Sequence, residues 1–210
     1  MDEFLKLGEF QYDVIREIGN IGAGHAATAL SEILHTEVDM FVPSVQLISF
    51  DQIADVLGGS EQLVVGVFLR MSGDIPGNMF FLLQIESAKK LVRAFMNNAK
   101  IAPPEDQDDF SEMELSALSE VGNILAGSYL SSLAEFTKKR MTPSVPAIAI
   151  DMAGAILSAG LMQLGEAGEY ALVVDTTFLQ GKADIEGHFF LLPDPGAVSQ
   201  LLAALGVDSI

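Results

Sequence analysis

The stretch DVIREIGNIGAGHAATALSEILHTEVDMFVP at residues 13–43 recurs as SALSEVGNILAGSYLSSLAEFTKKRMTPSVP at residues 116–146. The two stretches share 10 of their 31 residues, where average composition would give roughly two. The likeness continues downstream, where GDIPGNMFFLL at 73–83 resembles ADIEGHFFLLP at 183–193. The chain is therefore an internal duplication, and the two copies should share one structure.

Each copy begins with a long predicted helix. The first covers residues 12–35, and its counterpart covers residues 111–138. Large apolar residues recur along the first helix at roughly helical spacing, as expected of a helix with one apolar face. These residues are Val14, Ile18, Ile21, Leu30 and Ile33.

Beyond the helix, the pattern of each copy predicts a strand, a short helix, a β-hairpin and a closing helix. In the first copy these elements are a strand at 38–50, a helix at 51–59, strands at 62–71 and 77–85 and a helix at 86–96. We expect Pro43 at an edge or bulge, because proline cannot donate to a central strand ladder. The closing helix of the second copy covers residues 194–206, with Pro195 in its first turn.

The unit is thus α-β-α-β-β-α, repeated twice. Two copies with strand edges to hide would join into one continuous, mainly antiparallel sheet flanked by helices. The sequence therefore predicts an α/β (α+β) fold with pseudo-two-fold symmetry. We expect one domain over residues 1–210, made of repeats at about 1–100 and 110–210 and joined by the acidic, proline-containing linker AKIAPPEDQDDF. The second copy also carries an insertion, which we place near residues 165–168.

The composition excludes several classes of function. The 210 residues include 29 acidic and 11 basic ones, for a formal net charge of −18, and such a chain repels nucleic-acid phosphates and anionic lipids. Without cysteine there can be no disulfide, thiolate nucleophile or zinc–thiolate site. The three histidines are interpreted as surface or supporting groups. The N-terminus lacks a signal-peptide pattern, and no apolar run approaches the ~18 residues of a membrane span. We expect a cytoplasmic monomer that binds neither nucleic acid nor membranes.

The duplication preserves one polar pair. Glu17 and Asn20 stand three residues apart on the first long helix, and Glu120 and Asn123 repeat them on the second. In each copy the carboxylate and the carboxamide should project from the same face. Asn inside a helix costs several tenths of a kcal/mol relative to Ala, and the glycine before it costs roughly 0.5–1 kcal/mol more. A single E-x-x-N is ordinary solvated surface, but a repeated and costly one indicates a function.

A second motif lies in the same helix. Residues 22–27, Gly-Ala-Gly-His-Ala-Ala, fit the dinucleotide-binding fingerprint. That fingerprint requires a preceding strand and a turn that opens a helix, whereas the preceding residues have helical spacing. The second copy also has Leu125 at the position of Gly22. We therefore interpret these small residues as sites of close helix packing.

The repeated spacing [Asp/Ser]-x3-Glu-x2-Asn-x22-Pro resembles that of the CheC/CheX/FliY phosphatases of bacterial and archaeal chemotaxis. The matching residues are Asp13, Glu17, Asn20 and Pro43 in the first copy and Ser116, Glu120, Asn123 and Pro146 in the second. The resemblance implies a hydrolase that removes the aspartyl-phosphate of the response regulator CheY-P.

In that family the Asn positions the hydrolytic water and the Glu forms a salt bridge to a lysine of the regulator. The resemblance thus implies that Asn20 and Asn123 are the water-positioning groups, with Glu17 and Glu120 as the docking carboxylates. It implies no cofactor bound by this chain, because the regulator supplies Mg²⁺.

The resemblance implies a second partner, the deamidase CheD, which is inhibited by binding. The small, apolar segment at residues 151–162 is a candidate surface for CheD, although a buried core helix would have the same composition. An alternative function also stays open at this point. The duplicated fold would then be a non-catalytic adaptor that binds CheD or a component of the flagellar switch.

Overall fold

The computed structural model describes residues 7–98, 110–164, 170–180 and 183–206. The first copy comprises α1 (Glu9–Leu34), β1 (Asp39–Phe41), β2 (Val45–Ser49), α2 (Phe50–Val56), β3 (Leu63–Gly73), β4 (Gly77–Gln84) and α3 (Ile85–Asn98). The second comprises α4 (Glu112–Thr137), β5 (Met141–Pro143), β6 (Ala147–Met152), α5 (Ala153–Leu164), β7 (Tyr170–Gln180), β8 (Ala183–Pro193) and α6 (Pro195–Ala204). The order of helices and strands is the same in both copies.

The strands form one eight-stranded sheet in the order β1-β7-β8-β4-β3-β5, with β2 also beside β7 and β6 also beside β3. Strands β4 and β8 pair antiparallel at its centre, so the two copies meet there. Strands β1 and β2 of the first copy pair with β7 of the second, and β5 and β6 of the second pair with β3 of the first. Each copy therefore completes the sheet of the other, which confirms the predicted continuous antiparallel sheet and its pseudo-two-fold symmetry.

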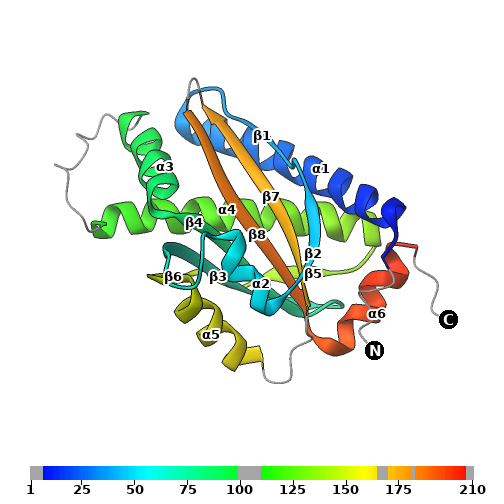
Figure 1. The fold of residues 1–210 in the computed structure, drawn as a ribbon. Coiled ribbons are helices and arrows are strands. Elements are labelled where there is room, and N and C mark those ends of the chain that lie inside the picture. The colour runs from blue at the N-terminus through cyan, green and yellow to red at the C-terminus, as the bar shows by residue number, and fades with distance from the viewer. Residues whose placement is uncertain (1–6, 99–109, 165–169, 181–182, 207–210) are drawn as a thin grey trace.

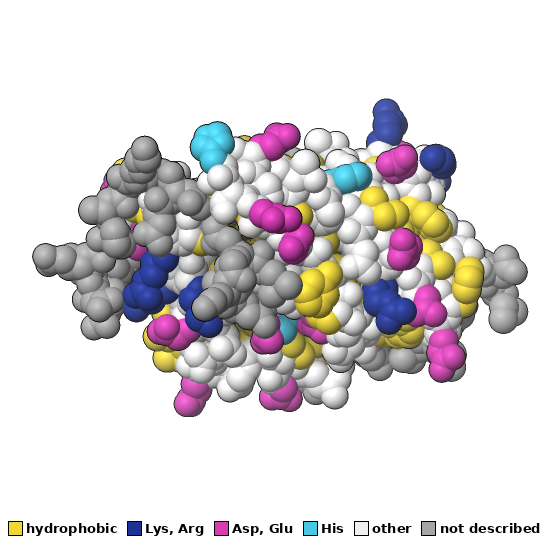
Figure 2. All heavy atoms as spheres, turned by 90° about the horizontal axis from the view of Figure 1, so that it is seen from above, with side chains coloured by type: hydrophobic (Ala, Val, Ile, Leu, Met, Phe, Trp, Pro, Cys, Tyr) yellow, Lys and Arg dark blue, Asp and Glu magenta, His cyan; other side chains and the backbone are white. Residues whose placement is uncertain are grey.

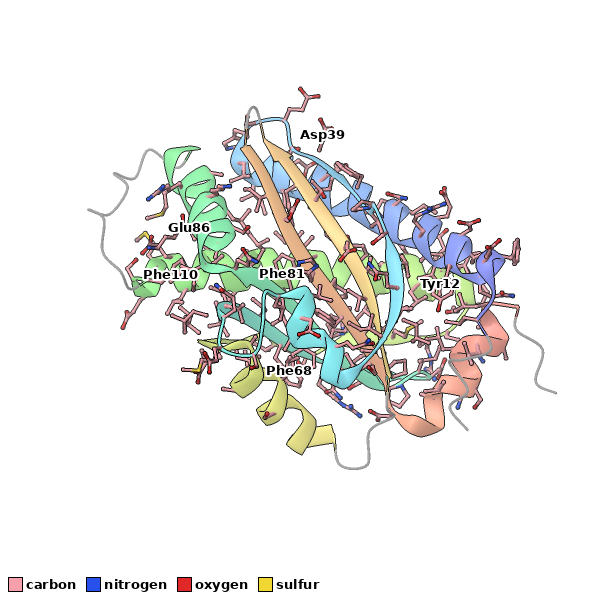
Figure 3. The ribbon with its side chains drawn as sticks, viewed as in Figure 1. Tyr12, Asp39, Phe68, Phe81, Glu86 and Phe110 are labelled. Atoms are coloured by element: carbon pink, nitrogen blue, oxygen red, sulfur yellow. The ribbon has the colours of Figure 1, made fainter. Side chains whose placement is uncertain are left out.

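The helices cover both faces of this sheet. Figure 1 shows α1 and α4 running in opposite directions on one face and α2 on the other. The larger hydrophobic core lies under α1 and α4, where Phe81 of β4 contacts Phe178 of β7 with ring centroids 5.9 Å apart. A second core lies under α2 and α5, where Phe68 and Phe80 are 5.1 Å apart. Figure 3 labels Phe81 and Phe68, which belong to these two cores.

The two long helices approach each other closely at Gly22. A Cβ atom added there would lie 2.8 Å from Cδ1 of Tyr129 and 3.1 Å from its Cα atom. Only glycine fits at such a distance, so the prediction that small residues permit close helix packing is confirmed for Gly22. It is wrong for Gly24, where a Cβ atom would meet nothing within 4 Å.

The sequence pattern was wrong about part of the core face of α1. Ile18 and Leu30 are buried as predicted, but Ile21 is 45% exposed and Ile33 is also exposed. The core side of the helix is instead built partly from small residues, because close contact with α4 leaves no room for large ones. Ala23 and Ala26 are fully buried there.

Two further expectations concern the strand after α1 and the insertion in the second copy. The predicted strand at 38–50 is divided into β1 and β2, because residues 42–44 lie opposite only two residues of β7, 175 and 176. Pro43 therefore lies at a bulge beside the edge strand β1, as expected. Part of the extra length of the second copy lies in α5, which has 12 residues where α2 has 7. The predicted insertion point near 165–168 lies outside the described residues. In the part of the chain that the structure describes, no helix is both long and apolar enough to cross a bilayer.

Candidate functional site

The first Glu/Asn pair lies on the outer surface of α1. Glu17 is exposed, while Asn20 is half-buried because it reaches the connector between β1 and β2. The Oδ1 atom of Asn20 accepts a hydrogen bond of 2.9 Å from the backbone N–H of Val42. Val42 directly precedes Pro43, and a residue before proline is restricted to extended conformations. The Asn and the Pro of the motif, distant in sequence, thus belong to one local structure.

A buried glycine directly before each Asn lets the long helix lie close to the residues beneath it. A Cβ atom at Gly19 would lie 3.2 Å from Cγ2 of Val42, and one at Gly122 would lie 2.6 Å from Cγ1 of Val67. The glycine that precedes each Asn therefore lets the helix backbone rest on apolar side chains of the sheet or its connector. The Glu/Asn face is left pointing outward.

The second pair has the same place on α4 but different surroundings. Glu120 and Asn123 are both exposed, and within the described residues no hydrogen bond holds the Asn123 side chain. The connector between β5 and β6 is attached to the sheet instead, because the N–H of Ser144 donates to the carbonyl of Arg70 (2.8 Å) and Ser144 Oγ accepts from the N–H of Arg70 (3.0 Å). Val145, the repeat counterpart of Val42, is 87% exposed.

The carboxylate of Asp175 in β7 holds the connector between β1 and β2 against the sheet. Ser44 Oγ donates a short hydrogen bond to Asp175 of β7, and the backbone N–H of Asp175 donates to the carbonyl of Ser44 at 3.1 Å. The other oxygen of Asp175 hydrogen-bonds Nδ1 of His188 at 2.8 Å. Burial raises the pKa of Asp175, but the hydrogen bonds from His188 and Ser44 outweigh burial and hold that pKa below its ordinary value.

Sequence reasoning did not single out Asp175 or Ser44. The available signals were an acid within the apolar strand pattern VVDTTF and a serine directly after the motif proline. His188 was interpreted as a surface or supporting group, and in the structure its Nδ1 atom is hydrogen-bonded to Asp175.

Charged side chains surround the first pair on α1. Asp13, the first residue of the motif, is exposed and forms a 2.8 Å ion pair with Arg16 one turn along α1. Figure 2 shows acidic side chains spread over one face of the molecule, with hydrophobic side chains between them. Among the described residues, no group of three or more His, Asp or Glu side chains is arranged to hold a metal ion.

The comparisons with known proteins match this architecture. The sequence signature of the CheC-like family matches residues 10–47 and, again, residues 113–150. Each match begins in the first turn of a long helix and ends in the strand after its connector, so it spans one Glu/Asn pair and its proline.

Relatives and solved structures agree with that signature. A Bacillus subtilis (strain 168) protein named "CheY-P phosphatase CheC" is 44% identical over 212 residues, covering 99% of this chain and 100% of that protein. The flagellar motor switch phosphatase FliY of the same organism is 29% identical over 143 residues, covering 68% of this chain and 36% of that protein. The crystal structure of Thermotoga maritima FliY superposes with a TM-score of 0.73 at 21% identity, covering 95% of this chain and 98% of that one.

A continuous sheet built from two copies, each with one long helix that carries a Glu/Asn pair, defines this class of α/β protein. Since the Bacillus subtilis protein is 44% identical over 99% of this chain, the chain belongs to the CheC-like family.

Proposed function

We propose that this protein is a phosphatase that hydrolyses the aspartyl-phosphate of the response regulator CheY-P. The observation that carries the proposal is the full-length identity of 44% with a protein named CheY-P phosphatase CheC. The outward-facing Glu/Asn pair on each long helix is the part of the surface that we assign to this reaction.

Asn20 and Asn123 are the water-positioning groups in this proposal. A carboxamide does not exchange protons near neutral pH, but it both donates and accepts hydrogen bonds, so it can orient an attacking water as a Gln does in GTPases. The water oxygen forms a new bond to phosphorus while the bond from phosphorus to the aspartyl oxygen breaks. The products are inorganic phosphate and the free carboxylate of the regulator. The phosphoryl group and Mg²⁺ both belong to the regulator, and this chain binds no cofactor.

Glu17 and Glu120 are the docking carboxylates. Both are exposed, and each stands one helical turn from its Asn, so a cation bound by the Glu lies beside the carboxamide. An exposed ion pair is worth only about 0.2–1 kcal/mol, so the Glu contributes orientation more than affinity. The net charge of −18 favours rapid encounter with a basic region of the regulator.

The test is the decay of phosphorylated CheY from the same organism, measured with wild type and with the Asn20→Ala/Asn123→Ala double variant. Loss of both positioning groups should slow catalysed hydrolysis about 10²–10³-fold and leave CheY binding intact. The matched control is Glu32→Ala/Glu135→Ala, which alters an exposed pair repeated on the same two helices. Full activity in the Asn double variant would contradict the residue assignment. An inactive wild type that still binds CheY would favour the adaptor function.

We also propose, from the family membership, that the protein binds the deamidase CheD and inhibits it. The candidate segment at 151–162 forms the end of β6 and most of α5, and its Ala153 and Leu157 are buried in the second core. Its exposed residues include Ala155 and Ser158, which a partner can reach.

The deamidase activity of CheD, measured with and without this protein, tests the inhibition. Ala155→Arg should relieve it if α5 is the docking surface. Inhibition that Ala155→Arg leaves unchanged would place the surface elsewhere, and a wild type that leaves CheD fully active would contradict the proposal. We further propose a monomer, to be checked by light scattering.

A further inference from the structure

Two glycines in the long helices have no structural explanation among the residues that the structure describes. Gly24 and Gly127 occupy the same position in the repeat, four residues after each Asn. A Cβ atom at either would meet nothing within 4 Å, and neither glycine has a positive φ. Neither packing nor backbone conformation therefore requires glycine, although glycine in a helix interior lowers stability relative to alanine. Both copies nevertheless retain it.

Each long helix also carries an exposed apolar residue near its N-terminus, before the Glu/Asn pair. Phe10 is 68% exposed and Met113, its repeat counterpart, is 54% exposed. Each stands seven residues before the Glu of its pair. Large apolar side chains left in water at matching positions are typical of an interaction surface.

The repeated positions lie in line along each helix. Residues seven apart on an α-helix differ by only about 20° around its axis, so Phe10, Glu17 and Gly24 share one stripe of α1. Met113, Glu120 and Gly127 share the matching stripe of α4. With a rise of 1.5 Å per residue, each stripe is about 21 Å long, and the Asn of each pair lies beside its glycine end.

We infer that each stripe is the docking surface for the response regulator, with the apolar residue as an anchor and the glycine as a point of direct contact with the regulator's backbone. The inference rests on the proposed function and deepens it. The stripe is continuous with the Glu/Asn pair. A regulator that receives the Asn side chain must therefore also cover the residues next to that side chain. A bare helix backbone lets a partner chain approach where a methyl group would hold it away. That distance determines how far the adjacent Asn reaches into the regulator.

The first test adds one methyl group to each glycine. Gly24→Ala/Gly127→Ala should raise the melting temperature, because alanine favours the helix, and should lower kcat/KM for phosphorylated CheY by about tenfold or more. The matched control is Gly196→Ala in α6, where a Cβ atom also meets nothing within 4 Å. It should leave kcat/KM unchanged. Unchanged turnover in the double variant would overturn the inference.

Binding to CheY activated with beryllofluoride and Mg²⁺ separates this inference from the proposed function, because it needs no hydrolysis. A wild type that binds this stable mimic but does not hydrolyse CheY-P contradicts the function, and weaker binding by the alanine variant still supports the stripe. A wild type that neither binds nor hydrolyses overturns both.

The second test removes the apolar anchors. Phe10→Ser/Met113→Ser should weaken binding to activated CheY about tenfold without lowering the melting temperature, since both side chains are exposed. Unchanged binding would overturn the stripe. A change in the mass of the protein in solution, in place of weaker binding, would also overturn it by showing that the stripe joins two copies of this chain.

Discussion

The two copies differ most in the connector that follows each long helix. In the first copy the connector is held from both sides, by the Asn20 side chain through the N–H of Val42 and by Asp175 through Ser44. In the second copy, as far as the described residues show, the connector is hydrogen-bonded to the backbone of Arg70 in the sheet, and the Asn123 side chain has no hydrogen-bond partner. Both helices carry the Glu/Asn pair, the glycine before the Asn and the glycine four residues after it, although Leu125 in α4 replaces Gly22 of α1.

This difference shows that the duplication preserved the residues of the Glu/Asn pair but not the exposure and hydrogen bonding of the Asn side chain. The carboxamide of Asn20 already accepts one hydrogen bond and is half-buried, so it also has a structural role. The carboxamide of Asn123 is exposed and available to a partner. The comparison yields four predictions, of which the first has the largest expected effect.

The two valines of the connectors should respond very differently to truncation. Val42 is 3% exposed within the main core, whereas Val145 is 87% exposed. Val42→Ala should lower the free energy of unfolding by about 2 kcal/mol, which corresponds to a melting temperature about 4–8 °C lower for a chain of this size. Val145→Ala should change neither by a measurable amount. Equal effects in a thermal melt would show that the connectors are not different in packing.

The second pair should carry the larger share of the phosphatase activity. A regulator that uses Asn20 must compete with the hydrogen bond to Val42, which is worth about 0.5–1.5 kcal/mol net. The first site should therefore be about 2–10-fold less active than the second. In a CheY-P decay assay, Asn123→Ala should slow hydrolysis more than Asn20→Ala does. The reverse order would mean that the hydrogen bond prepares Asn20 for catalysis rather than withholding it.

The same two substitutions should have opposite effects on stability. Asn20→Ala leaves the N–H of Val42 without its acceptor, which should cost about 1 kcal/mol. Asn123→Ala replaces a poor helix former on an exposed surface and breaks no hydrogen bond, so it should stabilise by a few tenths of a kcal/mol. Urea unfolding of the two variants checks the sign of each change. A destabilising Asn123→Ala would reveal a contact that the structure does not show.

Much of the fold could be predicted from the sequence because the two copies share enough identical residues to reveal the duplication. The helix periods, the hairpin strands and Pro195 at a helix start are local signals, and the structure confirms them. The pairing of β1 and β2 with β7 of the other copy joins residues more than a hundred positions apart, and no local pattern encodes it. Ile21 was assigned to the core because an apolar residue at helical spacing does not reveal how closely a second helix packs.

The candidate site shows a similar limit. The Glu/Asn pairs, once recognised, fell on outward helix faces as expected, because three-residue spacing fixes the face. Val42 and Val145 are identical residues at matching positions with opposite burial. Their burial depends on how each connector contacts the sheet, and the repeated sequence alone does not reveal those contacts.

The smallest predicted effect concerns low pH, which should weaken the attachment of the first connector and leave that of the second unchanged. The pKa of Asp175 is held below its ordinary value in the folded protein, so the ionised carboxylate adds stability above about pH 4, the ordinary range of an unfolded Asp. This contribution is lost as the pH falls through the lower, folded pKa. Since the group is partly accessible to solvent, we expect about 0.5 kcal/mol after screening.

The variant Asp175→Asn should therefore be slightly less stable than wild type near pH 7. This gap in the free energy of unfolding should close in acid. The control Asp39→Asn removes an exposed charge from β1 and should show no such closing gap. Hydrogen exchange can locate the effect once each rate is divided by its intrinsic rate, because acid should lower the protection factor of Val42 and leave that of Ser144 unchanged. The second connector is held by backbone groups of Arg70 that do not titrate. A gap that persists below the folded pKa would mean that Asp175 acts through packing and not through its charge.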